Sequence, residues 1–439
     1  MKSWKPLLWI AVLLAVPCSG GRANSAEPTD VGRVDMGPGY AVPASGLPID
    51  SPVPTPEFNP DNPWGPPPPG TPPCEPATTC CGICGQGSCN PPCWYLEQGV
   101  RILTRNRARH EGLVFREVDA NTHPELLSTK SDTFDIAPGY LAKLGRYIGR
   151  DACNNDRFVE VSFWGLNQWD VDAGASALHA ISVEDNQDTP NLLYRFGGDL
   201  VTPFPEEVIG FQGADTVQVD YDHSVNNIEL NYWVRPRARA DRLVLQPNGR
   251  WVRQCQPGCY VSHVFGLRAM TIDDGFAMRS RGTVAFRQAA EPFQASGDYL
   301  IDAGNTLLGF QLGTDLVFRS CRWSWGGRFR VAPFINLAEQ DSQIFADQLN
   351  ATHDGLGPRV AVSRSADDEG AAAAIELGFM ADYRLSPHCV VELGYDLMWV
   401  PGVALAPDQI DFNLNGLPDL NNNATLFYHG LTMSLEIAW

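Results

Sequence analysis

The stretch LFYHGLTMSLEIAW, residues 426–439, predicts the fold of this chain. Counting back from Trp439, every second residue is apolar, including Ile437, Leu435 and Met433, and small or polar residues stand between them. A period of two predicts a strand with one apolar and one polar face. An aromatic residue closing such a strand is typical of a transmembrane β-barrel, with lipid outside and a polar lumen inside. We interpret these four residues as the membrane-insertion signal; a strand of a soluble sheet is the alternative.

The same alternation recurs upstream, which favours the barrel. The clearest cases are 373–385 and 388–399, with only a tight turn between them. Segments of about ten residues are long enough to cross a bilayer when tilted. Ten candidates follow one another: 94–104, 138–147, 157–167, 226–235, 259–272, 306–318, 328–338, 373–385, 388–399 and 426–439. Long connections alternate with short ones, as in outer-membrane barrels.

We therefore predict an all-β fold, a transmembrane antiparallel up-and-down β-barrel of about ten strands. A further hairpin around Leu192–Phe196 would raise the number to twelve. Strand 328–338 is the weakest candidate, because Pro333 cannot donate a ladder hydrogen bond.

Three segments of different composition divide the chain. Residues 1–25 read as a cleaved signal peptide, since Lys2 and Lys5 precede the apolar run LLWIAVLLAV. Residues 26–93 are rich in Pro, Gly and Cys, which predicts a disordered periplasmic arm. Residues 94–439 form the predicted barrel, so the sequence predicts export to the outer membrane with the help of the barrel assembly machinery.

Six cysteines crowd one short part of the arm, between Cys74 and Cys93. Zinc ligation is one interpretation. Disulfides are favoured in an exported chain, and could cross-link the arm to a partner or to the cell wall. Cys255 and Cys259 are a second candidate pair.

The formal net charge of −19 excludes a nucleic-acid partner. Acidic residues gather in the long connections, for example Asp170, Asp222 and Asp367, and arginines in the short ones. This segregation predicts acidic extracellular loops on the side away from the periplasm.

Alternation places charged side chains on the polar faces of the strands. The predicted lumen-lining residues are Glu97, Arg101, Glu229, Arg268, Asp315, Arg330, Glu376, Asp382, Glu392, Asp396 and Glu436. Ten strands give a narrow interior, and buried charges there must pair. One interpretation is a salt-bridged plug; the other is a narrow, cation-preferring conduit.

The last long connection contains DFNLNGLPD. Asp411, Asn413, Asn415 and Asp419 stand at alternate positions before and after Gly416, as in part of a calcium-binding loop. The acidic residue that closes such a loop is replaced by Asn422. Calcium as a cofactor is therefore one hypothesis, and an Asn/Gly-rich turn is the other.

The motifs KLGRYIGRDACNNDRFVEVSFWGLNQW, NNIELNYWVR, VFGLRAMTIDDGF, NTLLGFQLGTDLVFR and ELGYDLMWVPGVALAPDQI occur in this order. This ordered set resembles the beta-barrel porin-7 family of planctomycete-type outer-membrane proteins, over about residues 94–439. The resemblance implies a porin-like barrel in a lipid bilayer and brings no catalytic motif.

The sequence contains no GxSxG, HExxH or phosphate-binding loop, so we do not expect an enzyme. Two functions stay open: a porin-like barrel with a narrow charged lumen, and a structural or adhesive surface barrel whose acidic loops bind divalent cations or partners.

Overall fold

The structure of the protein is a computed structural model. It describes residues 93–106, 109–116, 124–131, 134–176, 180–181, 188–189, 192–194, 210–211, 215–237, 242–247, 250–254, 257–284, 293–348, 356–411 and 419–439. The chain divides into two units, Met1–Ser88 and Cys89–Trp439, and all described residues belong to the second. The proposed signal peptide and all but Cys93 of the proposed arm lie outside the described residues, so both stay predictions.

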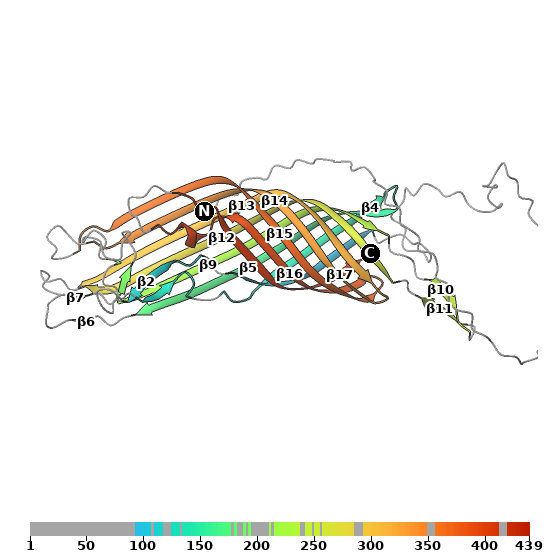
Figure 1. Cartoon of the computed structure of the whole chain (residues 1–439), viewed down its shortest axis with the longest axis horizontal. Coiled ribbons are helices and arrows are strands. Elements are labelled where there is room, and N and C mark those ends of the chain that lie inside the picture. The colour runs from blue at the N-terminus through green and yellow to red at the C-terminus, as the bar shows by residue number, and fades with distance from the viewer. Residues whose placement is uncertain are drawn as a thin grey trace, which may run out of the picture. The chain divides into compact units, whose positions relative to one another are not determined.

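Ten antiparallel strands close into one barrel, which confirms the fold class expected from the sequence (Figure 1). The strands are β1 (Trp94–Arg105), β4 (Ala137–Arg150), β5 (Asn155–Ser176), β9 (Thr216–Pro236), β12 (Gly258–Val284), β13 (Phe293–Arg319), β14 (Trp323–Ala346), β15 (Val360–Ser386), β16 (Cys389–Val403) and β17 (Ala424–Ala438). Each strand pairs with the barrel strands before and after it in the chain, and β17 pairs with β1.

The seam between the first and last strands is closed at its end by two tryptophans. Trp94 N–H donates to the carbonyl of Trp439 at 3.0 Å, and Trp439 N–H donates to the carbonyl of Trp94 at 2.9 Å. A closed ring leaves no unpaired strand edge, which a bilayer requires.

In the half of the barrel that includes the Trp94 and Trp439 end of the seam, apolar side chains face outward. Phe310, Ile335 and Phe379 are all more than half exposed, and together with their neighbours they form an outward apolar band. Trp323, Trp325 and Trp439 stand exposed at the edge of this band, where aromatic girdles meet the interface. Among the described residues, no helix is long and apolar enough to cross a membrane.

In the other half the alternation continues with its polarity reversed. On β12, Met270, Ile272, Phe276 and Met278 are buried inside the barrel, and Asp273 faces out. The strands therefore run 21 to 27 residues in β9, β12, β13, β14 and β15, well beyond the roughly ten that a bilayer requires. The candidates from the sequence end where this reversal begins.

The interior of the extended half is filled by an apolar cluster, here called the tip core. It includes Leu113, Phe211, Met278, Tyr299 and Ile344, all at most 2% exposed. Strand residues and connecting segments contribute together, because β2 (Gly112–Arg116) pairs with β3 (Glu125–Ser128) and with β8 (Leu192–Tyr194) outside the barrel ring.

The twelve-strand alternative is therefore wrong: β8 carries residues of the proposed extra hairpin but does not enter the barrel. Two further pairs also stand outside the ring: β6 (Ala180–Ile181) with β7 (Asp188–Thr189), and β10 (Arg242–Leu245) with β11 (Trp251–Gln254). The proposed Cys255–Cys259 disulfide is also wrong, because Cys259 is a free thiol.

Pro333 lies within β14 and faces outward, so the weakest candidate strand does belong to the barrel. The pairing of β13 with β14 passes from Gly309–Phe334 to Leu312–Val331 without a partner for Pro333. This interruption has a simple cause, since proline has no N–H to donate. On its other side Pro333 stays in register with Ala373 of β15.

A bulge in β5 changes which residues face inward. Leu166 has a φ of 63°, and the register with β9 shifts between Gly165 and Asn167. The extra residue leaves Leu166 outside and turns Asn167 inward, where its amide donates to the carbonyls of Arg101 and Ala137. The bulge thus ties three strands together where the polarity reverses.

Candidate functional site: the barrel interior

The eleven residues proposed to line the lumen all lie on inward-facing positions of barrel strands, and none is exposed. They are Glu97 and Arg101 on β1, Glu229 on β9, Arg268 on β12, Asp315 on β13, Arg330 on β14, Glu376 and Asp382 on β15, Glu392 and Asp396 on β16, and Glu436 on β17. Strand alternation positions each of them, because every second side chain points to the same face.

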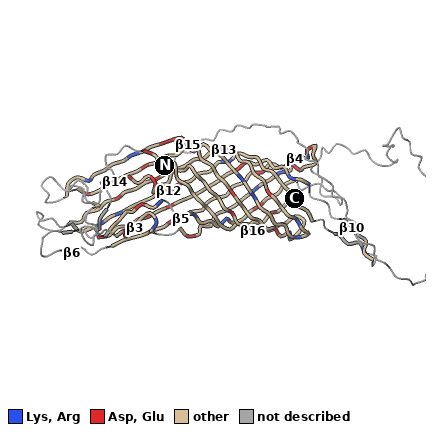
Figure 2. Tube along the Cα trace, viewed as in Figure 1, with Lys and Arg blue, Asp and Glu red and all other residues tan. Residues whose placement is uncertain are grey.

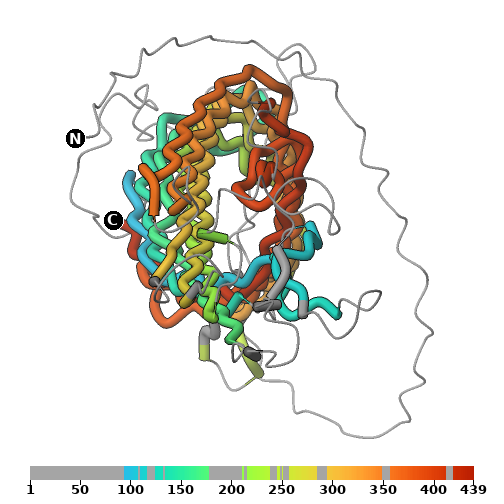
Figure 3. Tube along the Cα trace, turned by 90° about the vertical axis from the view of Figure 1, so that its left-hand side faces the viewer, coloured from blue at the N-terminus to red at the C-terminus, as the bar shows by residue number. Residues whose placement is uncertain are grey.

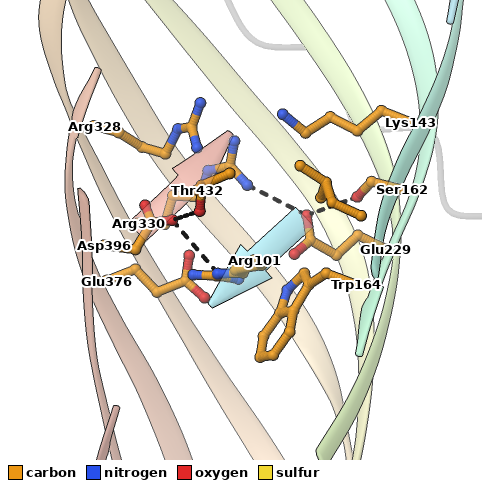
Figure 4. Close-up of a pocket in the computed structure, with 11 residues that line it drawn as sticks. Arg101, Lys143, Ser162, Trp164, Glu229, Arg328, Arg330, Glu376, Asp396 and Thr432 are labelled. Atoms are coloured by element: carbon orange, nitrogen blue, oxygen red, sulfur yellow. Dashed lines mark hydrogen bonds and ion pairs between the residues drawn. The ribbon is translucent and has the colours of Figure 1, made fainter. Parts of the chain in front are cut away.

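Six of these residues meet in what we call the ion-pair layer: Arg101, Glu229, Arg268, Arg330, Glu376 and Asp396. Arg268 Nη2 lies 2.6 Å from Glu376 Oε1, and Arg268 Nε lies 3.8 Å from Glu229 Oε1. Arg330 Nη1 approaches Glu229 Oε2 at 3.3 Å. Figure 4 shows Arg330 and Glu229 pointing toward each other across the interior.

Glu229 is the centre of this layer, and its carboxylate is also held by neutral donors. Gln311 donates to Oε2 at 2.8 Å, Asn231 to Oε2 at 2.9 Å and Asn227 to Oε1 at 2.9 Å. Ser162 adds a longer bond of 3.2 Å. Glu229 itself is only 3% exposed. A carboxylate this deeply buried needs such compensation, since a lone buried charge is strongly unfavourable.

The second pair of the layer joins β1 to β16. Arg101 Nε lies 3.4 Å from Asp396 Oδ2, which also accepts a hydrogen bond of 2.6 Å from Thr432. The guanidinium of Arg101 stands 4.2 Å from the ring centroid of Trp164. Trp164 therefore closes the layer toward the apolar half of the interior through a cation–π contact.

More ion pairs lie between the layer and the end of the barrel at Trp439. Lys143 Nζ is 2.8 Å from Glu97 Oε1. Arg328 approaches Asp315 at 3.8 Å and Glu392 at 3.5 Å. The alternation from which we predicted the lumen-lining residues places Lys143 and Arg328 inside as well.

The space left between these side chains is small. A cavity of about 30 Å³ is lined by Arg101, Lys143, Arg328, Arg330 and Asp396 among others. This volume has room for a few water molecules at most. The described side chains that line this cavity therefore leave little free space between them.

Above the ion-pair layer the interior becomes apolar. We call this level the apolar belt: Trp164, Trp169, Met270, Ile272, Phe334, Met398 and Tyr428, with smaller apolar neighbours. All of its members are at most 8% exposed. A hydrated ion crossing this level would lose its water and meet few polar groups in return, which is costly.

A second polar cluster lies beyond the belt and is centred on Asp274. Its carboxylate contacts Arg105 Nη1 at 3.0 Å and the hydroxyl of Tyr221 at 2.5 Å. His223 Nδ1 lies 2.7 Å from Asp274 Oδ1, and His223 Nε2 lies 2.7 Å from the hydroxyl of Tyr428. An ionised carboxylate can only accept, so Nδ1 carries the proton and Tyr428 donates to Nε2.

This cluster lies outside the membrane-spanning part of the strands, because the neighbouring outward residues are Asp222 and Asp273, both exposed. Burial and the nearby Arg105 guanidinium lower the pKa of His223 to about 4, so its ring is neutral. Burial raises the pKa of Asp274, but Arg105 and His223 outweigh burial and hold it below its usual value.

The sequence did not single out Asp274, because the candidate strand ended at residue 272. A signal was present in MTIDDGFAMRS, where Met270, Ile272, Phe276 and Met278 keep the period of two around Asp274. A lone acid at an apolar position of such a run indicates a buried, paired carboxylate.

The chain after β16 turns into the barrel. We call residues 404–411 the strap; it contains the 3-10 helix η1 (Ala406–Gln409). Ala404, Leu405 and Ala406 are at most 2% exposed; Leu405 packs with the belt and Ala406 with the tip core. In the end-on view of Figure 3, the red trace of this part of the chain bends into the ring of strands.

Of the four proposed calcium ligands, only Asp411 and Asp419 lie among the described residues, so the calcium site stays a prediction. Asp411 lies at the end of the strap, where its carboxylate is 3.3 Å from Arg364. Asp419 is exposed, and Asn413 and Asn415 lie outside the described residues. Within the described part of the chain there is no group of three or more His, Cys, Asp or Glu side chains placed to hold a metal.

Comparison with known families agrees with this architecture. The model of the family described as Putative beta barrel porin-7 matches residues 205–439, more than half of the chain. The chain belongs to that family. No curated protein matches the chain.

Several solved structures are similar to this porin-7 barrel at low identity. Outer membrane protease OmpT from Escherichia coli is 10% identical with a TM-score of 0.35, covering 80% of this chain and 97% of that one. The transport unit of the autotransporter AIDA-I from Escherichia coli is 5% identical with a TM-score of 0.21, covering 81% and 93%. A Pseudomonas aeruginosa FadL homologue is 9% identical with a TM-score of 0.21, covering 78% and 89%. At these TM-scores the likenesses carry no argument.

Family membership makes this chain a porin-family β-barrel of the outer membrane, embedded in the lipid bilayer through its outward apolar band. The family description names a beta barrel porin. Cleavage of the signal peptide, assembly by the barrel assembly machinery and cross-linking through the arm stay predictions.

Proposed function

We propose that this protein is a porin-like outer-membrane barrel whose narrow, charged lumen is closed at rest. The observation that carries the proposal is Arg268, which reaches Glu376 on β15 and Glu229 on β9 from β12. One side chain thereby connects strands on separate parts of the ring. The lining is charged, as in a conduit, but the opposite charges pair with one another.

The arrangement of levels supports the same proposal. Ion pairs occupy the layer, apolar side chains occupy the belt, and the tip core fills the extended half. A solute would have to separate buried pairs and then cross an apolar level. Both steps are unfavourable, the first by several kcal/mol for each uncompensated charge, about 3–5.

Electrical recording across planar bilayers tests this proposal. The purified full chain, shown to be folded by its heat-modifiable migration in gels, should give no large stable conductance steps. The variant with Arg268→Ala and Glu376→Ala should give brief openings more often, because the layer loses its central tie. A large, stable conductance from the unmodified chain would overturn the closed lumen.

A second candidate function is a surface barrel that binds divalent cations, and the outer face of the extended strands favours it. Three pairs of exposed acids stand directly opposite each other on neighbouring strands: Asp170–Asp222, Asp302–Asp341 and Glu339–Asp367. We call these six residues the acidic collar. Figure 2 marks acidic positions along this extended part of the barrel. Like charges in register destabilise a sheet, and bound cations would relieve that repulsion.

Several acids that we expected in loops, such as Asp170, Asp222 and Asp367, thus lie on strands. Burial and the neighbouring carboxylate of Asp274 raise the pKa of Asp222. Protease protection by millimolar calcium, compared with equal magnesium, tests the cation role. Protection that is lost when Asp302 and Asp341 are both changed to Asn would support it, and protection that is unchanged would exclude the collar.

A further inference from the structure

The strap is held in the lumen by side chains that recognise its main chain. Asn305 on β13 accepts a hydrogen bond from Ala404 N–H at 2.7 Å and donates to the Ala404 carbonyl at 2.7 Å. The amide of Asn305 therefore pairs with the strap as a neighbouring strand would. Asn305 is 2% exposed, so these bonds form in a site without competing solvent.

Two more anchors follow along the strap. Ala406 N–H donates to Asp274 Oδ2 at 2.8 Å, which connects the strap to the polar cluster beyond the belt. The hydroxyl of Tyr299 accepts from Asp411 N–H at 3.0 Å and donates to the Asp411 carbonyl at 3.2 Å. Every one of these contacts uses a backbone group of the strap, and none is a ladder bond between strands.

The entry to the strap is a bend that requires glycine. Gly402 has a φ of +86°, and a Cβ added there would stand 2.4 Å from the carbonyl oxygen of Ala371. Asn336 donates to the Gly402 carbonyl at 2.9 Å and fixes the bend from β14. The chain can therefore leave the wall sharply and enter the lumen within two residues.

We propose that the strap is a displaceable closure of the lumen, hinged at Gly402 and latched by Asn305, Asp274 and Tyr299. The physical reason is the contrast in attachment. The barrel strands share continuous ladders. The strap instead depends on these few bonds to side chains, on the Arg364–Asp411 ion pair, on the bonds between Gln409 and Asn421, and on the packing of a few apolar residues. Segments with few such contacts open before the rest of a fold does. The proposal rests on the proposed function, because it names what closes the lumen beyond the belt.

Thiol accessibility tests the strap without recourse to conductance. Ala338 on β14 is 3% exposed and lies opposite Asn305 in the strand register, so a cysteine there is shielded beside the seat of the strap. The full chain carrying Ala338→Cys is treated in outer membranes with a positively charged, membrane-impermeant methanethiosulfonate reagent. Modification is read from the mass of the peptide that contains position 338, which separates it from the native cysteines.

Asn305→Ala combined with Tyr299→Phe removes four of the latch bonds and should speed modification of this cysteine about tenfold or more. Gly402→Ala should do the same by a different route, since it blocks the bend. Gln340→Ala is the matched control: Gln340 is another buried amide on the inner face of β14, and within the described residues it bonds no strap atom. Its rate should equal that of the parent.

A cysteine at Ser162, inside the ion-pair layer, reports whether the barrel itself has opened. It should stay protected in every variant that keeps heat-modifiable migration. Unchanged modification at position 338 in both folded strap variants would overturn the strap as a closure, and would leave the closed lumen standing. Equal acceleration at positions 162 and 338 would also overturn it, because the whole barrel would then be loosening.

Discussion

Arg268 and Glu376 meet at 2.6 Å although β12 and β15, which carry them, are separated in the ring by β13 and β14. The contact therefore crosses the interior and joins parts of the wall that no ladder joins. Both side chains are at most 9% exposed. A charge pair in this position fixes the distance between two sides of the barrel. It also fills the interior between them.

We expect Arg268→Ala to destabilise the barrel by about 3–5 kcal/mol, since it leaves the carboxylate of Glu376 buried without its partner and removes one of the two arginines that contact Glu229. Replacing Arg268 by Met together with Glu376 by Leu should recover most of that loss, because apolar residues of similar volume can substitute for a buried pair. Urea unfolding in detergent micelles, followed by tryptophan fluorescence, measures both. Equal stability of the parent and Arg268→Ala would contradict the cross-lumen tie.

Stability should fall as the pH drops from about 6.5 toward 4. The pKa of His223 is lowered to about 4 in the folded chain. Between these two pH values the unfolded chain therefore binds a proton that the folded chain does not. The stabilisation is therefore complete above the ordinary histidine pKa and is lost below it, by roughly 3 kcal/mol. His223→Asn keeps a donor for Asp274 and cannot titrate. Its unfolding midpoint should depend less on pH in this window, and identical pH slopes would show that His223 is already charged.

Trp439→Asp should strongly reduce the assembled fraction of the protein. The change places a charge at the membrane interface beside the closing seam with Trp94. Trp439→Phe keeps an aromatic ring and both backbone bonds, so it should assemble nearly normally. The readout is the heat-modifiable fraction in isolated outer membranes. Normal assembly of the Asp variant would remove Trp439 from the insertion signal.

Asp302→Asn should stabilise the barrel in the absence of divalent cations. Asp302 faces Asp341 directly across two strands, and removing one of two opposed charges should contribute about 0.2–1 kcal/mol. The gain should shrink in 1 M salt, where the Debye length is about 3 Å. Thermal unfolding with EDTA, at low and at high salt, measures it. A loss of stability at low salt would mean that the collar is not repulsive.

The part of the fold that touches lipid was predictable from the sequence. All ten barrel strands were located, because outward Leu, Phe and Trp residues alternate with polar ones over the width of a bilayer. The alternation then reverses, as at Met270 and Ile272, and a search for apolar-outward strands stops there. For this reason the sequence did not predict the extra length of the strands, and it did not predict Asp274 as a site residue.

The candidate site was likewise only partly predictable from the sequence. Inward positions such as Glu229 and Arg330 follow from the period of two alone. Their partners do not, because partnership depends on which strands face each other across the ring and on the shear of the barrel. Asn305 offers no sequence signal at all: its role arises from a segment 99 residues later that folds back into the lumen.

The reversal of polarity along β12 to β15 also determines which charges act on a molecule at the tip of the barrel. From Thr271 to Val284, β12 continues for about 14 residues, which at about 3.3 Å per residue is roughly 45 Å along a tilted strand. The Debye length in physiological salt is about 8 Å. The tip therefore stands several screening lengths away from the charged headgroups. The acidic collar, by contrast, lies at the level of Asp273 and Gly275, close to the start of the extension. A molecule at the tip is therefore screened from the field of the collar as well as from that of the membrane.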